Sequence, residues 1–367
     1  MDKKEAANRT LARAKTPAKT GFAAAHTEME KEKEKPGRLC IVYNCDDAYC
    51  CHTAASIASL FDSNKEAAEI CIYVLGNGIC AESEAKLLQL ARLAGQGRSL
   101  HVILLTDFAK QVREAAGMEL DAGKFTLTAL ARMFTADFLP KTEQRALYLD
   151  CDTIVTGSLW PLFSMPLSGC AAAMAMEPTI YQEVRTSLGL LPDMPYFNAG
   201  MILMDLAAWR RENVRDTCMA VYRAAGGKFL FSDQDCLNKA LKGRVLPVSQ
   251  QWNFLSNYAY RHYAELVKTA RWYGLFQKQQ AFEAAKRCPV VVHFAGDERP
   301  WIAGNRNPYR KLYWKYIQKT AYHNQKPVEK KRMYMLAYHA VNVLTAVCPL
   351  ARQCISAWFY KRHVSKM

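Results

Sequence analysis

The chain has 367 residues, half of them hydrophobic, and a formal net charge of +15 at pH 7. Residues 1–38 carry ten Lys/Arg against six Asp/Glu and residues 319–367 carry nine against one, which leaves +3 for residues 39–318. A nearly neutral body excludes an evenly basic nucleic-acid binder, whereas basic ends suit an anionic surface such as lipid head groups.

Residues 1–37 are rich in Lys, Glu and Ala and lack both an apolar stripe and the apolar core of a secretory signal. We therefore expect a disordered or frayed extension, and a protein that stays on the cytosolic side of the membrane. Most of the thirteen cysteines stand in apolar runs and no C-x-x-C pair occurs, which indicates reduced thiols that pack as small hydrophobic residues rather than disulfides or a zinc site. Examples are Cys40, Cys71, Cys170 and Cys288.

From residue 38 on, apolar strand patterns alternate with helical patterns. The predicted elements are strand 38–47, helix 52–62, strand 69–76, helix 81–94, strand 100–107, helix 127–140, strand 146–149, strands 170–176 and 196–206, helices near 207–225 and 233–242, and strand 288–296. Such near-continuous apolar strands between helices are typical of an α/β fold with a mostly parallel sheet covered on both faces. Ligands of these sheets bind beyond the carboxyl ends of the strands.

Two carboxylates, Asp150 and Asp152, directly follow the apolar strand "ALYL". Residues i and i+2 of an extended chain point to the same side, so we expect both acids to converge on one point. Paired carboxylates either raise a pKa or share a cation, and hard divalent cations take oxygen ligands and bridge to phosphates. The alternative is an acidic loop that binds no ligand. The D-x-D pattern alone does not distinguish the two, because any acidic loop can contain it.

A second strand end, "VVHFAGDERPW" (291–301), carries His293 and Arg299. A lone histidine on a strand is usually a core residue, but one that joins two aspartates would be a third metal ligand. Arg299 has the geometry to bind a phosphate bidentately.

Two further segments place polar residues at the ends of predicted elements. "FSDQDCLNKAL" begins a helix with Ser232 or Asp233 as the expected N-cap, and no capping need explains Gln234. In "PYFNAGMILMDL", Asn198 is a candidate hydrogen-bonding group for a polar ligand, and Gly200 marks a candidate close approach of the backbone.

Taken together, the chain from Arg38 to about Trp314 resembles glycosyltransferase family 8, the retaining GT-A enzymes that include bacterial lipopolysaccharide galactosyl- and glucosyltransferases and glycogenin. The segments that carry the resemblance are "IVYNCDD", "ALARMF", "LYLDCDTIV", "YFNAGMILMDLAAWR", "SDQDCLN" and "HFAGDERPW". The resemblance implies a GT-A fold, with a Rossmann-like, mostly parallel mixed sheet flanked by helices, and a catalytic domain over 38–318.

The resemblance also implies a role for each matching residue. Mn²⁺, with Mg²⁺ as the alternative, would be held on the diphosphate of UDP-glucose or UDP-galactose by Asp150, Asp152 and His293. The other donor contacts would be Asn44, Asp46 and Tyr49 near the uridine, Arg132, Asn198 on the acceptor and sugar side, and Arg299. Asp233 and Gln234 would be the catalytic pair beside the sugar. Two departures stand out, because Arg299 replaces a frequent Lys and Glu177 replaces a sugar-contacting Asp.

The implied reaction is transfer of a hexose to a hydroxyl of a glycan or glycolipid acceptor, in lipopolysaccharide or another surface glycan, with retained anomeric configuration. Gln234 is a poor nucleophile and Asp233 is the only acid at hand, so we favour front-face attack over a covalent intermediate. Two alternatives are a sugar-phosphate or nucleotidyl transferase, and a basic membrane-associated adaptor with a non-catalytic nucleotide-sugar-binding domain. No nucleic-acid partner is expected.

Residues 319–367 are predicted to be a basic amphipathic helical tail. Lys330, Lys331 and Arg332 precede a stretch, 333–351, without Asp, Glu, Lys or Arg, and aromatic and basic residues follow it. The stretch is barely long enough for a span and contains Pro349, so we expect helices that lie in the interface at the inner face of the cell membrane. A single span and packing on the body are the alternatives.

Overall fold

The computed structural model describes residues 36–346 except 124–125 and 297, and also residues 351, 355 and 358. The predictions for 1–35 and for most of 347–367 lie outside the described residues. No described helix combines the length and the apolar character needed to cross a bilayer.

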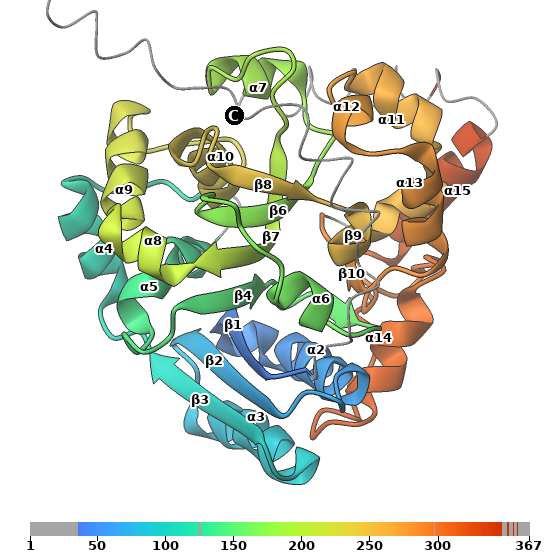
Figure 1. Cartoon of the computed structure of the whole chain (residues 1–367). Coiled ribbons are helices and arrows are strands. Elements are labelled where there is room, and N and C mark those ends of the chain that lie inside the picture. Colours follow the sequence, from blue (N-terminus) through green and yellow to red (C-terminus); the bar gives the residue numbers. More distant parts are fainter. Residues whose placement is uncertain are drawn as a thin grey trace, which may run out of the picture. The chain divides into compact units, whose positions relative to one another are not determined.

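The described residues form a seven-stranded sheet in the order β3-β2-β1-β4-β7-β6-β8 (Figure 1). Its strands are β1 Arg38–Asp46, β2 Glu69–Asn77, β3 Arg98–Leu104, β4 Arg145–Leu149, β6 Ala172–Met176, β7 Phe197–Asp205 and β8 Val245–Val248. Only β7 runs antiparallel to its neighbours, β4 and β6, and the other pairs are parallel. The predicted mostly parallel mixed sheet is confirmed. Strands β1, β2 and β6 are buried along most of their length, as their continuous apolar runs indicate.

Helices flank this sheet (Figure 1). The α-helices are α2 Cys50–Ser63, α3 Ala81–Ala94, α4 Phe108–Ala116, α5 Thr135–Phe138, α6 Trp160–Phe163, α7 Gln182–Ser187, α8 Leu206–Arg211, α9 Val214–Ala224, α10 Ser232–Ala240, α11 Tyr263–Thr269, α12 Tyr273–Phe276, α13 Gln279–Arg287, α14 Arg310–Ile317 and α15 Arg332–Ala346. The 3₁₀ segments are η1 Asp47–Tyr49, η2 Leu127–Phe134, η3 Gln250–Trp252 and η4 Ser256–Tyr260.

Two predicted helices differ from the structure. The segment 127–140 is mostly the 3₁₀ helix η2 and only briefly α-helical. The sequence did not show this, because apolar spacing over eight residues does not distinguish 3.0 from 3.6 residues per turn. The segment 207–225 is divided into α8 and α9 at Asn213, whose φ of 49° is left-handed, a conformation that asparagine tolerates.

A second sheet of three strands, in the order β5-β10-β9, was not predicted as a separate unit. Its strands are β5 Thr153–Val155, β9 Phe254–Leu255 and β10 Val291–His293. β10, the core of the predicted strand 288–296, pairs antiparallel with β5 and parallel with β9. The chain thus leaves the main sheet after β4 and enters this second sheet through β5.

The described cysteines are free thiols. Cys40 and Cys71 are buried, as predicted for cysteines that pack as hydrophobic residues. The same prediction is wrong for Cys170, which is half-buried, and for Cys288, which is exposed. Both stand at the edge of their apolar run, just before β6 and β10 begin.

Candidate metal and donor site

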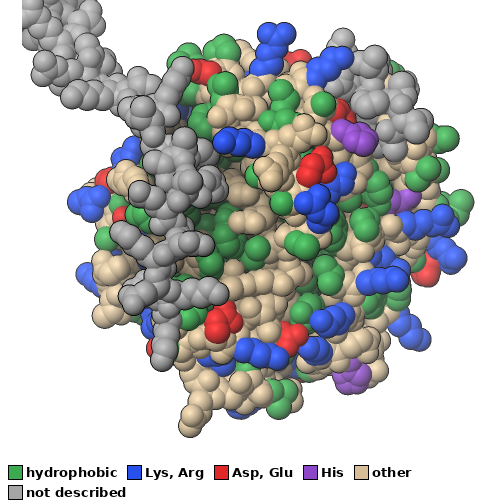
Figure 2. Space-filling model, turned by 45° about the vertical axis from the view of Figure 1, so that its right-hand side comes forward, with side chains coloured by type: hydrophobic (Ala, Val, Ile, Leu, Met, Phe, Trp, Pro, Cys, Tyr) green, Lys and Arg blue, Asp and Glu red, His purple; other side chains and the backbone are tan. Residues whose placement is uncertain are grey.

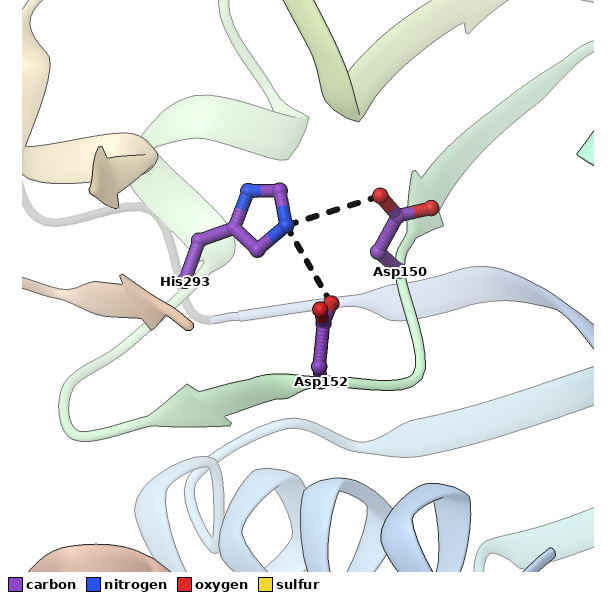
Figure 3. Close-up of side chains that lie close together, drawn as sticks. All are labelled: Asp150, Asp152 and His293. Carbon is purple, nitrogen blue, oxygen red and sulfur yellow. Dashed lines mark ion pairs between the residues drawn. The ribbon is translucent and has the colours of Figure 1, made fainter. Parts of the chain in front are cut away.

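Asp150 and Asp152 lie at the carboxyl end of β4, where the chain turns into β5 (Figure 3). The Asp150 amide still donates to the Gly200 carbonyl of β7 (2.9 Å), whereas the amide and hydroxyl of Thr153 donate back to the Asp150 carbonyl (3.2 and 2.8 Å). The acids therefore converge through a tight turn. The expected convergence is present, but the extended alternation given as its reason is wrong.

His293 reaches the two acids through the pairing of β10 with β5. Its partner in the ladder is Thr153, next to Asp152, and the Phe294 amide donates to the Asp152 carbonyl (2.9 Å). His293 Nε2 lies 3.5 Å from Asp150 Oδ2 and 3.2 Å from Asp152 Oδ1 (Figure 3). One ligand atom from each of the three residues lies within 4.8 Å of the other two.

This triad fits a hard divalent cation. Adjacent ligands of an octahedral ion with bonds of about 2.1 Å lie about 3 Å apart, close to the 3.5 and 3.2 Å that separate His293 Nε2 from the two carboxylates. Burial lowers the pKa of His293, which favours the neutral ring that ligates a metal. Gly200 leaves room for the ring, since a Cβ there would lie 2.1 Å from His293 Cε1 and 2.5 Å from Nδ1. The close approach predicted at Gly200 is confirmed.

Arg132, from η2, is buried between two acids. Its Nη2 lies 2.9 Å from Asp150 Oδ1 and its Nε lies 2.9 Å from Asp233 Oδ2. Burial acts to raise the pKa of Asp150, but Arg132, His293 and the Tyr148 hydroxyl (2.6 Å) outweigh it and hold that pKa below its usual range. Asp150 is therefore ionised at neutral pH, as a metal ligand must be.

Arg299 contacts the second acid of the pair, Asp152. Its guanidinium forms an ion pair with Asp152, donates to the Phe294 carbonyl (2.7 Å) and lies over the Trp301 ring. Trp301 in turn contacts Tyr49 edge to face, with ring centroids 6.2 Å apart. The predicted donor residues Arg299 and Tyr49 therefore lie on one aromatic cluster beside the triad.

The carboxyl end of β1 brings Asn44 and Asp46 to the same edge of the sheet. Asp46 accepts a hydrogen bond from the Tyr49 amide (3.1 Å), which fixes the following turn. Cys151, between the two acids, donates to the Asn44 carbonyl (2.8 Å). The Asn44 Oδ1 atom is buried and has no donor among the described residues, so a bound ligand can supply one.

Helix α10 starts differently from the prediction. Its N-cap is Phe231, not Ser232 or Asp233, and Ser232 has a left-handed φ of 45°. The Phe231 amide donates to Asp235 (2.8 Å), so an acid within the helix satisfies the amide of the N-cap residue.

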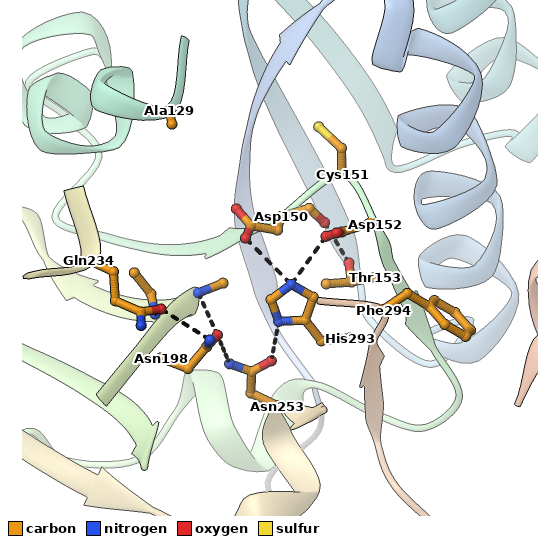
Figure 4. Close-up of polar contacts among 12 residues, drawn as sticks. Ala129, Asp150, Cys151, Asp152, Thr153, Asn198, Gln234, Asn253, His293 and Phe294 are labelled. Atoms are coloured by element: carbon orange, nitrogen blue, oxygen red, sulfur yellow. Dashed lines mark hydrogen bonds and ion pairs between the residues drawn. The ribbon is translucent and has the colours of Figure 1, made fainter. Parts of the chain in front are cut away.

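Gln234 is fixed at both ends of its amide, and Figure 4 shows its contact with Asn198. Oε1 accepts from Asn198 Nδ2 (3.0 Å) and the Ala199 amide (3.1 Å), and Nε2 donates to Glu177 (3.0 Å) and to the Tyr196 hydroxyl (3.0 Å). These contacts use the full capacity of the amide. Its orientation is therefore set before any ligand binds.

Asp233 is 3% exposed and has an unusual environment. The N–H of Arg132 Nε donates to the Ala129 carbonyl (3.1 Å), and Asp233 Oδ2 accepts no hydrogen bond from the described part of the chain. Burial raises the pKa of Asp233 to about 6, against the opposing effect of Arg132. A carboxylate held in this way is suited to bind hydroxyl groups of a ligand.

No sequence motif marks Asn253, yet it joins the two halves of the site. It lies between η3 and β9 and contacts both His293 and Asn198 (Figure 4). Asparagine in "QWNFL" carries no chemical signal by itself, and only the meeting of β9 with β10 gives it a partner. Tyr148 and Tyr196, which hydrogen-bond to Asp150 and Gln234, were also missed.

Comparisons with known proteins agree with this arrangement. The family model for glycosyl transferase family 8 matches residues 40–304. General stress protein A of Bacillus subtilis is 23% identical over 283 residues, which cover 76% of this chain and 93% of that protein. The lipopolysaccharide 1,2-glucosyltransferase of Escherichia coli K12 is 26% identical over 60% of this chain, which spans 66% of that protein. The solved structure of the galactosyltransferase LgtC with donor and acceptor sugar analogs has a similar fold, with a TM-score of 0.63, 22% identity, and coverage of 81% of this chain and 100% of that chain.

Proposed function

This chain belongs to glycosyltransferase family 8 and is a glycosyltransferase, and we propose that it transfers glucose or galactose from a UDP-sugar to a glycan hydroxyl with retained anomeric configuration. The observation that carries the proposal is the convergence of Asp150, Asp152 and His293 at the carboxyl ends of the strands. A metal-bound diphosphate at this edge is the usual placement of a ligand on an α/β sheet.

The proposed metal is Mn²⁺, with Mg²⁺ as the alternative, and the triad would hold it. Such a cation stabilises the negative charge that develops on a departing diphosphate. Arg299 adds a second cation next to Asp152, and Arg132 pairs with both Asp150 and Asp233. Both arginines are thereby placed to offset charge on a bound nucleotide.

Asn44, Asp46 and Tyr49 are assigned to the uridine. They lie at the end of β1, where Asn44 keeps an unpaired buried acceptor and Tyr49 packs on Trp301. Glu177, Asn198 and Gln234 are assigned to the sugar side, because one hydrogen-bonded network fixes all three.

Front-face attack is the proposed chemistry. The carbonyl of Gln234 already accepts two hydrogen bonds, so it is not available as a nucleophile. The acceptor oxygen bonds to the anomeric carbon as the bond to the phosphate oxygen breaks, and the departing phosphate oxygen takes the acceptor proton. Asp233 orients the sugar, and a glycosyl adduct on Asp233 detected by mass spectrometry would overturn this order of events.

The proposed acceptor is a glycan or glycolipid of a surface polymer such as lipopolysaccharide, a class taken from the named activity of one relative. The test is incubation with radiolabelled UDP-glucose or UDP-galactose, with Mn²⁺ or with EDTA. Slow metal-dependent hydrolysis of one donor supports the proposal. Equal release with EDTA, or release from neither donor, contradicts it.

The C-terminal part is proposed to attach a cytoplasmic enzyme to the inner face of the membrane. Helix α15 packs on η4, with Met335 and His339 buried, and exposes Met333, Val343 and Leu344. Figure 2 brings forward the side on which α13, α14 and α15 lie, and there Lys and Arg side chains stand among hydrophobic ones with few acids between them. Apolar and basic groups together favour an anionic interface.

The domain boundaries of this proposal are a catalytic domain over 38–318 and a membrane tail over 319–367. Removal of 326–367 is expected to move the protein from the membrane pellet to the supernatant. Unchanged sedimentation with membranes would reject the attachment.

A further inference from the structure

We infer that Asn253 is a positioning residue for the metal site, because it sets the tautomer of His293 and ties that ring to the sugar-side residue Asn198. The inference rests on the proposed metal-binding role of the triad. It adds a residue that touches neither the metal nor the sugar in the proposed site.

The argument begins at a backbone amide, which can only donate. The Gly200 amide donates to Asn198 Oδ1 (2.9 Å), so this atom is an acceptor and the orientation of the Asn198 side chain is determined. Asn253 contacts the same oxygen at 2.8 Å and must therefore present its NH₂ group to it. The carbonyl oxygen of Asn253 is left to face His293.

The same reasoning continues into the imidazole. Asn253 Oδ1 lies 3.0 Å from His293 Nδ1, and a carbonyl oxygen accepts, so Nδ1 carries the proton (Figure 4). In the neutral ring Nε2 then keeps its lone pair, and Nε2 is the atom directed at Asp150 and Asp152. A neutral histidine with the proton on the remote nitrogen is the form that binds a metal.

Without Asn253 the opposite tautomer would be favoured. The N–H of a protonated Nε2 would donate to the carboxylates, which lie only 3.2 to 3.5 Å away. The ring would then bind the two acids by a hydrogen bond and would have no lone pair directed at a metal. Asn253 is completely buried, so no water replaces its carbonyl at low cost. The residue therefore keeps the triad open for a cation.

The second contact of Asn253 extends this control to the sugar side. Asn198 donates from Nδ2 to Glu177 (2.9 Å) and to Gln234 (3.0 Å). The chain His293–Asn253–Asn198 is thus continuous with the amide of Gln234. Metal ligand and sugar pocket share one hydrogen-bonded frame.

The test compares two substitutions of nearly equal size in the full chain. Asn253→Leu removes the acceptor, and Asn253→Asp keeps an acceptor for Nδ1–H but loses the donor to Asn198. Asn64→Leu is the matched control, since Asn64 is also fully buried and its side-chain amide also makes hydrogen bonds outside the metal site, to Leu60, Gly157 and Leu159. Mn²⁺ affinity is measured without any sugar donor, from the electron paramagnetic resonance signal of the free ion, and thermal denaturation verifies folding.

We expect Asn253→Leu to weaken Mn²⁺ binding roughly 10- to 100-fold, the effect typical of a lost partner of a ligating histidine. Asn253→Asp should bind at least as tightly as the unmodified protein, and Asn64→Leu should bind equally well. Unchanged Mn²⁺ affinity in folded Asn253→Leu overturns the inference about Asn253 and leaves the proposed metal role of the triad intact. If that variant does not fold, a folded Asn253→Asp that loses affinity overturns it. Absence of Mn²⁺ binding by the unmodified protein overturns the proposed metal role first.

Discussion

Replacement of Gly200 by alanine would place a methyl group inside the space now taken by the His293 ring. The new Cβ would lie 2.1 Å from Cε1, 2.5 Å from Nδ1 and 2.9 Å from Asp150 Oδ2. Carbon atoms in contact lie about 3.5 to 4.0 Å apart, so the ring would have to move by about 1.5 Å. Strand β7 cannot retreat easily, because it is buried along its length and paired on both sides with β4 and β6.

Displacement of the His293 ring would leave the proposed cation with two protein ligands, Asp150 and Asp152, in place of three. Overpacking of this kind typically costs about 1 to 3 kcal/mol of unfolding free energy, and a misplacement of about 1 Å at a catalytic site costs roughly 100-fold in rate. Mn²⁺ affinity and metal-dependent UDP-sugar hydrolysis should both fall by at least roughly 10-fold. Urea denaturation at fixed pH measures the loss of stability separately.

Gly157→Ala is the control for this substitution. Its added Cβ would meet Val290 at 3.5 Å, an ordinary contact, and should leave metal binding and hydrolysis unchanged. A Gly200→Ala protein with the Mn²⁺ affinity and the activity of the unmodified chain would refute the assignment of His293 as a ligand held against β7.

Two further predictions concern Glu298 and Arg299. Burial raises the pKa of Glu298 to about 7, so the folded state binds the Glu298 proton more tightly than the unfolded state does. The contribution of this group to the unfolding free energy is therefore lost as the pH rises from about 4.5 through 7. Glu298→Gln removes this loss, and its advantage in unfolding free energy should grow from near zero at pH 4 to about 3 kcal/mol at pH 8 in urea titrations; an advantage independent of pH would contradict the argument. Arg299→Ala should lower kcat/KM for the donor roughly 100- to 1000-fold if the guanidinium stabilises the leaving diphosphate. The kcat/KM of Arg299→Lys should lie between those of Arg299→Ala and the unmodified enzyme. Equal kinetics for Arg299→Ala and the unmodified enzyme would remove Arg299 from the site.

The sequence alone determined the elements whose neighbours along the chain decide their form. The apolar run of β1 predicted a strand covered on both faces, the spacing of 81–94 matches α3 residue for residue, and the acids after β4 marked the edge of the sheet where the candidate metal site lies. The hydrophobic periodicity of such segments is a local property, so the sequence alone contains it.

Only the tertiary structure decided which remote segments meet. The exit of the chain into β5, the register that sets His293 opposite Thr153, and the position of Asn253 between His293 and Asn198 depend on the pairing of strands far apart in the sequence. The cap of α10 and the pKa of Asp233 follow from the same packing, because burial and neighbouring charges change the energies of groups whose own residue types stay the same. A local pattern gives each segment its period, but the register between segments is fixed by the fit of many side chains at once.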